Sequence, residues 1–265
     1  MNAFEIRDLV CAYADGQTVL EVPNLDIEFG KIVVFLGPSG VGKSTLLETL
    51  GLMNFTIQSG IITSAFCETD FKSLWEKDHD ISKVRNAHMS FVFQENNFLE
   101  NISAKENAMI PLLIQGRTTR EASEIINSWF KELDLEFITG NTKVTELSVG
   151  QKQRLSFIRA ASPAFTVLFG DEPTGNLDRK NGAVLMDALR AKIASDPSTM
   201  LSIIVSHDID LAIRYADQIV VLTKNATRKG QIKPEHIYDK SGLWRSSSGH
   251  SYKEIDFRKH ISDLF

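Results

Sequence analysis

One stretch of the chain decides its fold: IVVFLGPSGVGKST, from Ile32 to Thr45. Its first part, Ile32–Leu36, is a continuous apolar run of strand length closed by a glycine, the pattern of a strand buried on both faces of a parallel sheet. Residues 37–45 then fit the pattern GxxxxGK[ST], and a helical run over residues 44–52 follows. A strand, a glycine-rich turn and a helix in this order predict a phosphate-binding loop.

The residue types of this loop suit phosphate binding. Its glycines let successive N–H groups point at the phosphates, and the helix N-terminus adds the positive end of its dipole. Lys43 is predicted to supply a mobile charge to the β- and γ-phosphates, and Ser44 to ligate Mg²⁺. The residues expected to contact the nucleotide here are Gly37, Pro38, Ser39, Gly40, Val41, Gly42, Lys43, Ser44 and Thr45. The flanking strand and helix disfavour the alternative, a glycine-rich turn that only caps a helix.

A second apolar run, residues 166–169, is followed by Gly170 and two adjacent carboxylates, Asp171 and Glu172. Ligands of open α/β sheets bind at the carboxyl ends of the strands, which is where this pair falls. Asp171 is predicted to hold Mg²⁺ through its waters, and Glu172 to accept a proton from the water that attacks the γ-phosphate. A solvated acidic pair at a strand end is the alternative.

The remaining pattern predicts one composite α/β domain. Apolar strand-like runs at residues 201–205 and 219–222 alternate with a helical stretch at 182–193, as in a parallel, doubly wound sheet. A β-rich beginning precedes them, and residues 70–162 have helical spacing and are expected to form an inserted helical subdomain. The 265 residues, 43% hydrophobic and 24% charged, are enough for such a core.

Charge and cysteine content limit the partners and the compartment. The net charge of −5 argues against nucleic acid as a partner, because phosphate neutralisation needs a basic face. The chain begins without a signal-peptide pattern and contains no apolar run of about 18 residues, so a cytoplasmic location is expected. Cys11 and Cys67 form no CxxC pair, so neither a disulfide scaffold nor a zinc site is predicted.

A family resemblance becomes specific at Leu147-Ser148-Val149-Gly150-Gln151, about twenty residues before the acidic pair. This segment resembles the LSGGQ signature of ABC ATPases, which separates that family from other phosphate-binding-loop enzymes. The surrounding stretch ELSVGQKQRLSFIRAASPAFTVLFGDEPTGNLD is similar to the family throughout, and with further elements the similarity covers roughly residues 1–223. Four positions match further family elements: Tyr13 the aromatic that stacks on adenine, Gln94 the Q-loop, Asp178 the D-loop, and His207 the switch histidine.

The resemblance implies the ABC ATPase form of the phosphate-binding-loop fold. Its parts are a RecA-like parallel-sheet core, an N-terminal antiparallel β subdomain and an inserted helical subdomain. It implies ATP as substrate, Mg²⁺ as cofactor, and a homodimer in which each phosphate-binding loop closes against the other copy's signature. Implied catalytic residues are Glu172, His207, Lys43 and Gln94; implied metal ligands are Ser44, Gln94 and Asp171. Implied nucleotide contacts beyond the loop come from Tyr13, Gln94, Ser148, Gly150, Gln151 and Asp178.

Within the family, the segment FVFQENNFLENISAKENAMIPLL and the ending DEPTGNLD resemble the subgroup that drives lipoprotein release, macrolide export and cell-division permeases. The resemblance implies a transmembrane permease partner, bound in a groove formed by about residues 95–111, and therefore a peripheral place on the membrane. Two alternatives are a DNA-maintenance ABC ATPase and a ribosome-associated factor. The first normally carries long coiled coils between its nucleotide motifs, and the second normally carries two cassettes in one chain.

Two residues depart from the family pattern, and one segment extends beyond it. Val149 places a β-branched side chain where the signature has glycine, which predicts altered contacts across the dimer. Gly170 replaces an apolar strand residue, which predicts a slightly weaker strand.

The extension, residues 224–265, carries a net charge of +4 against −9 for the rest of the chain, and its aromatic residues include Trp244, Tyr252, Phe257 and Phe265. It is expected either to dock on the permease, the second subunit or anionic headgroups, or to be a solvated appendage.

Overall fold

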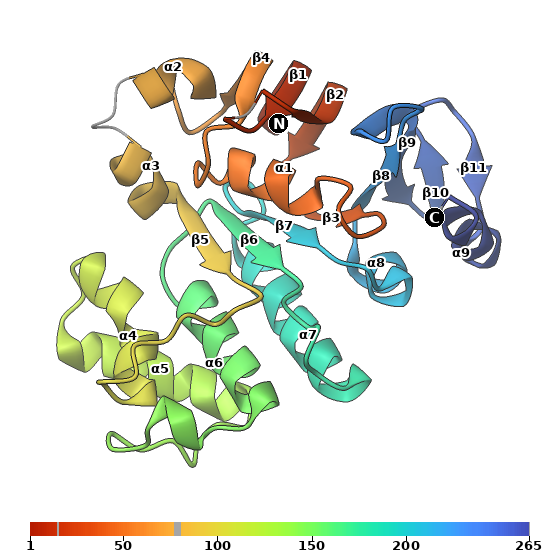
Figure 1. Ribbon diagram of the computed structural model, residues 1–265. Helices are drawn as coiled ribbons and strands as arrows, with labels where there is room; N and C mark the ends of the chain where they lie inside the picture. The colour runs from red at the N-terminus through yellow and green to blue at the C-terminus, as the bar shows by residue number, and fades with distance from the viewer. Residues whose placement is uncertain (15, 77–80, 265) are drawn as a thin grey trace.

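The structure, a computed structural model, describes residues 1–14, 16–76 and 81–264 (Figure 1). Phe265 and residues 77–80, which belong to segments considered above, lie outside the described residues. The strands are β1 (Asn2–Ala12), β2 (Thr18–Glu28), β3 (Ile32–Leu36), β4 (Ile57–Ser64), β5 (Met89–Val92), β6 (Val167–Asp171), β7 (Leu201–Val205), β8 (Gln218–Lys224), β9 (Gly230–Ser241), β10 (Leu243–Ser246) and β11 (Ser251–Tyr252).

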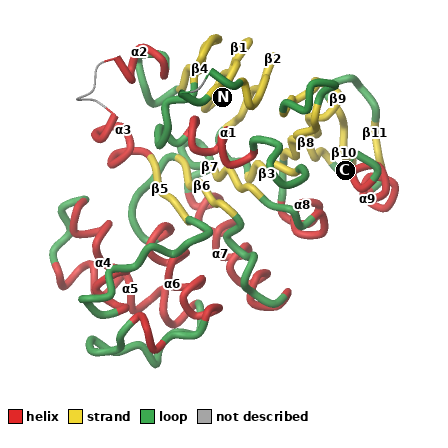
Figure 2. The backbone as a smooth tube through the Cα atoms, in the orientation of Figure 1, coloured by secondary structure: helices red, strands yellow, loops and turns green. Residues whose placement is uncertain are grey.

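The strands form one mixed sheet with the order β4-β1-β2-β9-β8-β3-β7-β6-β5 (Figure 2). Its core is parallel: β3 lies between β8 and β7, and β6 and β5 follow in the same direction. In the N-terminal part, β1 lies between β2 and β4 and pairs antiparallel with both. This arrangement confirms the expected α/β fold with a parallel core and an N-terminal antiparallel part.

Two apolar cores lie on the two faces of the sheet, and β3 contributes to both. Val33 and Phe35 belong to the core shared with β1, β2, β4 and α1 (Lys43–Leu50). Ile32, Val34 and Leu36 belong to the core on the opposite face, which the later helices cover. Because successive side chains of a strand point to opposite faces, a strand covered on both sides needs an uninterrupted apolar run.

The helical region contains α4 (Ala104–Ile114), α5 (Thr119–Glu132) and α6 (Val149–Ala161). Each begins with a capping box. The side chain of the N-cap Ser or Thr accepts a hydrogen bond from the backbone N–H three residues later, and the Glu or Gln side chain at that position accepts from the backbone N–H of the N-cap residue. Within the range expected to be helical, residues 70–162, the strand β5 departs from the pattern and pairs with β6. Shorter elements there are α2 (Phe71–Glu76), α3 (Ile81–His88) and the 3₁₀ turn η1 (Val144–Glu146).

The remaining helices are α7 (Arg179–Ser195), α8 (Ile209–Tyr215) and α9 (Glu254–Ser262). Both α7 and α8 begin at an aspartate whose side chain accepts a backbone N–H, namely Asp178 and Asp208. Among the helices within residues 1–14, 16–76 and 81–264, not one has both the length and the apolar character needed to cross a bilayer.

The C-terminal extension is folded onto the main sheet. We call β9, β10, β11 and α9 together the C-terminal unit (Figure 1, blue). β9 pairs antiparallel with β8, so this hairpin crosses the boundary expected at residues 223 and 224. Trp244 and Phe257 are almost fully buried, with rings stacked at a centroid distance of 4.8 Å. These aromatics therefore form an internal core, so the extension is not a solvated appendage, while its docking on a partner stays a prediction.

Candidate functional site

The phosphate-binding loop connects β3 to α1 and needs glycine at two positions. Gly37 has φ 154°, and a Cβ there would lie 2.6 Å from the carbonyl oxygen of Leu222 in β8. Gly42, the residue before α1, has φ 99°, in the left-handed region. A side chain at Gly37 would collide with backbone, and one at Gly42 would be strained, so the local chain path depends on these residues.

Lys43 is the first residue of α1 and bends back over the loop. Its Nζ donates to the carbonyl oxygens of Gly37 at 2.8 Å and Pro38 at 3.1 Å. Burial lowers the pKa of Lys43, although the carboxylates of Glu172 and Asp171 oppose the shift. The ammonium group thus lies inside the loop and donates to neutral carbonyl oxygens. Charged phosphate oxygens would form stronger hydrogen bonds with it than these carbonyls do.

Asp171 ends β6 beside the start of α1. Ser44 Oγ donates to Asp171 Oδ2 at 3.1 Å, which brings two predicted metal ligands together. Burial raises the pKa of Asp171, the charges of Glu172 and Glu48 add to the shift, and the bond from Ser44 opposes it. A partly buried carboxylate beside a hydroxyl fits Mg²⁺, which binds oxygen ligands and commonly takes only one or two carboxylates besides substrate phosphates.

Glu172 follows β6 in an unusual backbone conformation. Its φ is 49°, a left-handed value that costs a non-glycine residue on the order of 1–3 kcal/mol. Its N–H donates to the carbonyl of Val205 at the end of β7, at 3.0 Å. His207, two residues beyond β7, donates from Nδ1 to Glu172 Oε1 at 2.7 Å. The structure therefore brings together the predicted general base and the predicted switch histidine.

Gln153 was not singled out from the sequence, yet it holds the segment after Asp171. The side chain is fully buried in α6, and its Nε2 donates to the carbonyl of Pro173 at 2.9 Å and, at 3.3 Å, to that of Glu172. The signal was present in the sequence: Gln153 precedes the buried Phe157 by four residues, so a polar side chain lies on the apolar face of the helix.

Gly170 also contacts this segment. A Cβ at Gly170 would lie 3.2 Å from Cγ of Pro173, tighter than nearly all real Cβ contacts. The glycine in place of a larger strand residue is therefore matched to the proline that follows the acidic pair.

Tyr13, which follows β1 in the N-terminal part of the sheet, lies beside the phosphate-binding loop. Its hydroxyl is 2.9 Å from Oγ1 of Thr45 in α1, and the residue is 47% exposed. An aromatic residue tied at its tip and open to solvent has a free face for a nucleobase.

Ser148, Gly150 and Gln151 start α6, away from the loop. Ser148 Oγ accepts from the N–H of Gln151 at 3.3 Å, and the Ser148 N–H donates to Gln151 Oε1 at 2.8 Å. Val149 is 62% exposed at the same helix end. In the described part of the chain, no hydrogen bond joins these residues to the phosphate-binding loop, so one subunit does not bring the two motifs together.

Two predicted residues lie at the edges of the site. Gln94 is exposed two residues after β5, and no hydrogen bond links it to Ser44 or Asp171 within the described residues. Asp178 caps α7, accepting from Asn181 N at 2.8 Å and from Asn181 Nδ2 at 2.7 Å. Those bonds lower the pKa of Asp178 and hold its carboxylate in place.

Comparisons with known proteins find similar sequences. Residues 20–175 match the family model described as ABC transporter. The chain is 33% identical over 226 residues to the lipoprotein-releasing system ATP-binding protein LolD of Zymomonas mobilis, covering 83% of this chain and 93% of that protein. It is 33% identical over 216 residues to the macrolide export ATP-binding/permease protein MacB of Mannheimia succiniciproducens, covering 80% of this chain and 32% of that longer protein.

A solved structure extends the similarity to three dimensions. It is the dimeric, post-hydrolysis state of the ATP-binding cassette MJ0796 of Methanocaldococcus jannaschii, bound to ADP and phosphate. The TM-score is 0.73 at 27% identity, and the match covers 87% of this chain and 96% of that one.

Proposed function

The chain belongs to the ABC transporter family, and from this premise we propose that it is the ATP-hydrolysing subunit of a complex, in which it dimerises on ATP and drives a separate membrane permease. One observation carries the proposal: Ser44, Asp171, Glu172 and His207 converge beside the phosphate-binding loop, at the carboxyl edge of the parallel strands. Relatives named for lipoprotein release and macrolide export support a permease of that kind as the partner.

Nucleotide binding rests on the loop and on Tyr13. We infer that backbone N–H groups of residues 37–45 bind the phosphates, with Lys43 leaving its carbonyl acceptors for the β- and γ-phosphate oxygens. The exposed ring of Tyr13 takes the adenine. Mg²⁺ bound by Ser44 and Asp171, with Gln94 as a further ligand, would neutralise charge on the same phosphates.

The chemical step is assigned to Glu172 and His207. Glu172 accepts the proton of the attacking water, a role for which its carboxylate must be aimed at the end of the phosphate chain. His207 holds Oε1 of that carboxylate, while Val205 and Gln153 hold its backbone. Because both kinds of contact come from other elements, the strained conformation of Glu172 is maintained by the fold.

A second copy of the chain is proposed to complete the site. Ser148, Gly150, Gln151 and Asp178 are assigned to the nucleotide bound by the other subunit, with the N-terminus of α6 directed at its γ-phosphate. Exposed Val149 would then lie in the contact between the copies. ATP holds such a dimer closed, and its hydrolysis lets the dimer open and move what is attached to it.

The permease is proposed to bind at residues 95–111, and this attachment would place the chain at the cytoplasmic face of the membrane. Leu99 is 52% exposed there, and Arg159 of α6 donates to the carbonyls of Asn96 and Asn97, at 2.5 and 3.0 Å. The guanidinium also lies 4.7 Å from the ring centroid of Phe98. A shift of this segment would therefore pull on the helix that begins at the signature.

Function in DNA maintenance is not favoured by the helical region. Between Ser44 and Ser148, the longest helix that the structure describes is α5, with 14 residues. A coiled coil that separates the nucleotide motifs needs a sustained heptad repeat over far longer helices. The relatives reported above are named for transport, and nothing in them supports an action on DNA or ribosomes.

The experiment is to compare Lys43→Ala with wild type in ATP binding and ATP hydrolysis. The variant is expected to lose hydrolysis and to bind ATP much more weakly, since its ammonium group is the cation buried within the loop. Lys131→Ala, at an exposed lysine of α5, is the matched control and should behave as wild type. Normal turnover by Lys43→Ala would overturn the site assignment.

A further inference from the structure

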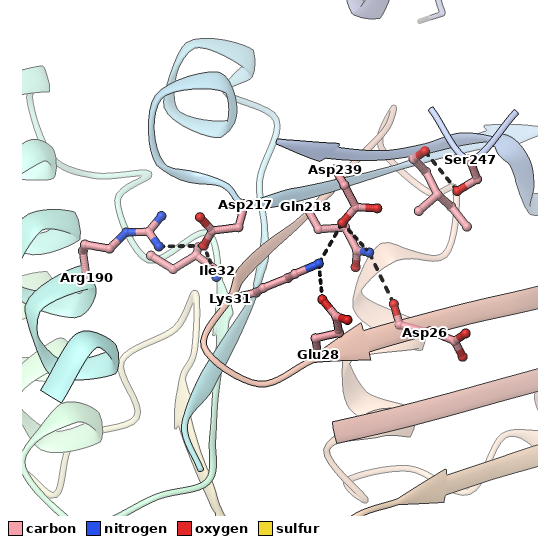
Figure 3. Close-up of polar contacts among 10 residues, drawn as sticks. Asp26, Glu28, Lys31, Ile32, Arg190, Asp217, Gln218, Asp239 and Ser247 are labelled. Carbon is pink, nitrogen blue, oxygen red and sulfur yellow. Dashed lines mark hydrogen bonds and ion pairs between the residues drawn. The ribbon is translucent and has the colours of Figure 1, made fainter. Parts of the chain in front are cut away.

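The C-terminal unit is fixed to the main sheet by charged groups (Figure 3). Lys31, just before β3, donates to Asp239 of β9 at 2.9 Å and to Glu28 of β2 at 2.6 Å. Gln218 of β8 donates to the same Asp239 oxygen at 3.2 Å. One carboxylate of the C-terminal unit thus joins two other parts of the sheet, and β9 has a fixed position.

The helix α9 is in turn fixed to β9 and β10. Its Phe257 is fully buried and stacks on Trp244 of β10. Its His260 shares a 2.8 Å hydrogen bond between Nε2 and the hydroxyl of Tyr238 in β9, and stacks on Tyr252 at a centroid distance of 4.4 Å. These contacts make α9 a rigid extension of the sheet.

The C-terminal unit holds α8 near both of its ends. Arg258 of α9 forms an ion pair with Asp210 in the first turn of α8. Lys240 of β9 donates to the carbonyl of Ile213 in the last turn, at 2.9 Å. The two helices also pack against each other. Since His207 lies two residues before α8, the C-terminal unit contacts the helix that follows the predicted switch histidine.

Support for α8 on its other side is weaker. An open cavity of about 210 Å³ lies between α8 and the start of α7, lined in part by Leu177, Gly182 and Leu211. Arg179 approaches Asp210 across it at 3.8 Å, but its side chain is 96% exposed. Tyr215 reaches α7 by a 3.3 Å hydrogen bond to the carbonyl of Ala183. The first turn of α8, next to His207, is therefore bordered by a cavity on one side and α9 on the other.

We propose that Arg258 and Asp210 are positioning residues for ATP hydrolysis, through which the C-terminal unit holds α8 and keeps His207 on the carboxylate of Glu172. The inference rests on the proposed function, because it assigns His207 to the hydrolytic site. Without the ion pair, the first turn of α8 shifts toward the cavity, and Glu172 loses its partner for part of the time. The consequence is a slower chemical step with unaltered nucleotide binding.

The test uses the full-length chain with Arg258→Gln, Asp210→Asn and the double variant. An ion pair between half-exposed side chains is weak, so each single variant is expected to lower kcat by only about threefold to fivefold. KM for ATP should stay within about twofold, because Tyr13 and the phosphate-binding loop are untouched. The double variant should be no slower than the slower single variant, as expected for one shared interaction.

Two further variants separate positioning from general stability. Arg258→Lys keeps the charge and should recover most of the lost kcat, while Lys259→Gln, at the next and exposed residue of α9, is the matched control and should have wild-type kcat. Hydrogen exchange of nucleotide-free protein gives a readout that does not depend on hydrolysis. Exchange at the amides of α8 should quicken in Arg258→Gln and stay unchanged in α5. Truncation after Lys240 is avoided because it would uncover the buried ring of Tyr238.

The outcomes are distinct. A kcat of Arg258→Gln equal to that of Lys259→Gln, with unchanged exchange in α8, overturns the inference and leaves the proposed function intact. Equal losses in Arg258→Gln and Lys259→Gln also overturn it, because the ion pair would then be irrelevant. Absence of ATP hydrolysis by wild type under any Mg·ATP concentration overturns the proposed function, and the inference with it.

Discussion

Nδ1 of His207 donates to Oε1 of Glu172 at 2.7 Å, joining the loop after β7 to the residue after β6. A carboxylate only accepts hydrogen bonds, so Nδ1 of His207 carries a proton in this contact. Among the described residues, no hydrogen bond is formed by the second carboxylate oxygen of Glu172. This relationship, together with the contact between Ser44 and Asp171, supports the separate roles proposed for the two adjacent acids, and variants can distinguish these roles.

Glu172→Gln should stop hydrolysis while leaving ATP binding intact. The amide oxygen can still accept from His207, but the side chain no longer takes a proton, so turnover should fall on the order of 10²-fold or more. The variant should accumulate as an ATP-bound dimer, visible by gel filtration in Mg·ATP alongside an ATPase assay. A variant that stays monomeric and hydrolyses normally would show that Glu172 is not the base.

Asp171→Asn should have a different effect. Burial raises the pKa of Asp171, so ionisation of this group is disfavoured in the folded chain and opposes folding increasingly as pH rises through its ordinary range. The neutral amide should therefore raise the Tm of nucleotide-free protein at neutral pH, by about 1–2 °C. The same variant should lose most of the additional stabilisation that Mg·ATP confers on wild type, because the metal ligand is gone. Thermal melts with and without Mg·ATP test both effects, and a lower Tm without nucleotide would contradict the first.

Tyr13 should contribute through its ring. Tyr13→Phe removes the bond to Thr45 but keeps the aromatic face, so ATP affinity should change little. Tyr13→Leu should weaken ATP binding by about 1–3 kcal/mol, the usual contribution of stacking between a base and an aromatic ring. Competition by inorganic tripolyphosphate, which has no base, should be equal in all three proteins. Weaker tripolyphosphate binding by Tyr13→Leu would mean that the residue supports the loop rather than adenine.

The C-terminal unit should loosen in mild acid. Burial lowers the pKa of His236 and of His260 from the ordinary value of 6.5, with Glu235 and Asp263 opposing the shifts and Lys233 and His250 adding to them. As pH falls, these histidines take up protons in the unfolded chain before they do so in the folded chain. The free energy of unfolding is therefore unaffected by them above pH 6.5 and decreases as pH falls below it. Amide exchange in α9, followed from about pH 7.5 to 5.5 and corrected for the intrinsic rate, should quicken relative to α5.

A variant checks the cause of that change. His236 is buried, and its Nδ1 has no hydrogen-bond partner among the described residues, so His236→Gln removes a titrating group without breaking a bond at that atom. The acid loosening of α9 should become smaller in His236→Gln. An unchanged pH dependence would assign the effect to His260 and its bond with Tyr238 instead.

Local patterns predicted the parallel strands, the phosphate-binding loop and the acidic pair, whereas the signature residues and Tyr13, Gln94, Asp178 and His207 were singled out through the family resemblance. Ile32–Leu36 became β3 as predicted, and the apolar run before Asp171 became β6, because a strand buried on both faces needs an uninterrupted apolar sequence. The glycines of residues 37–42 and the order of strand, turn and helix place Lys43 and Ser44 at the carboxyl edge of the sheet. The roles of all the site residues remain proposals, and those of Ser148, Gly150, Gln151, Asp178 and Gln94 depend in addition on a second copy or a permease.

By itself the sequence determined which residue types lie at the ends of which strands, since periodicity, glycine placement and capping residues act over a few neighbouring positions. Only the tertiary structure decided how Glu172 is held, because its left-handed backbone depends on Val205, Gln153 and His207, which are distant in the chain. The C-terminal extension shows the same limit. Its basic composition was compatible with a solvated appendage, but Trp244 stacks on Phe257, and Arg258 forms an ion pair with Asp210, 48 positions earlier in the chain. Burial of that kind is a property of packing between distant segments, which local sequence patterns do not encode.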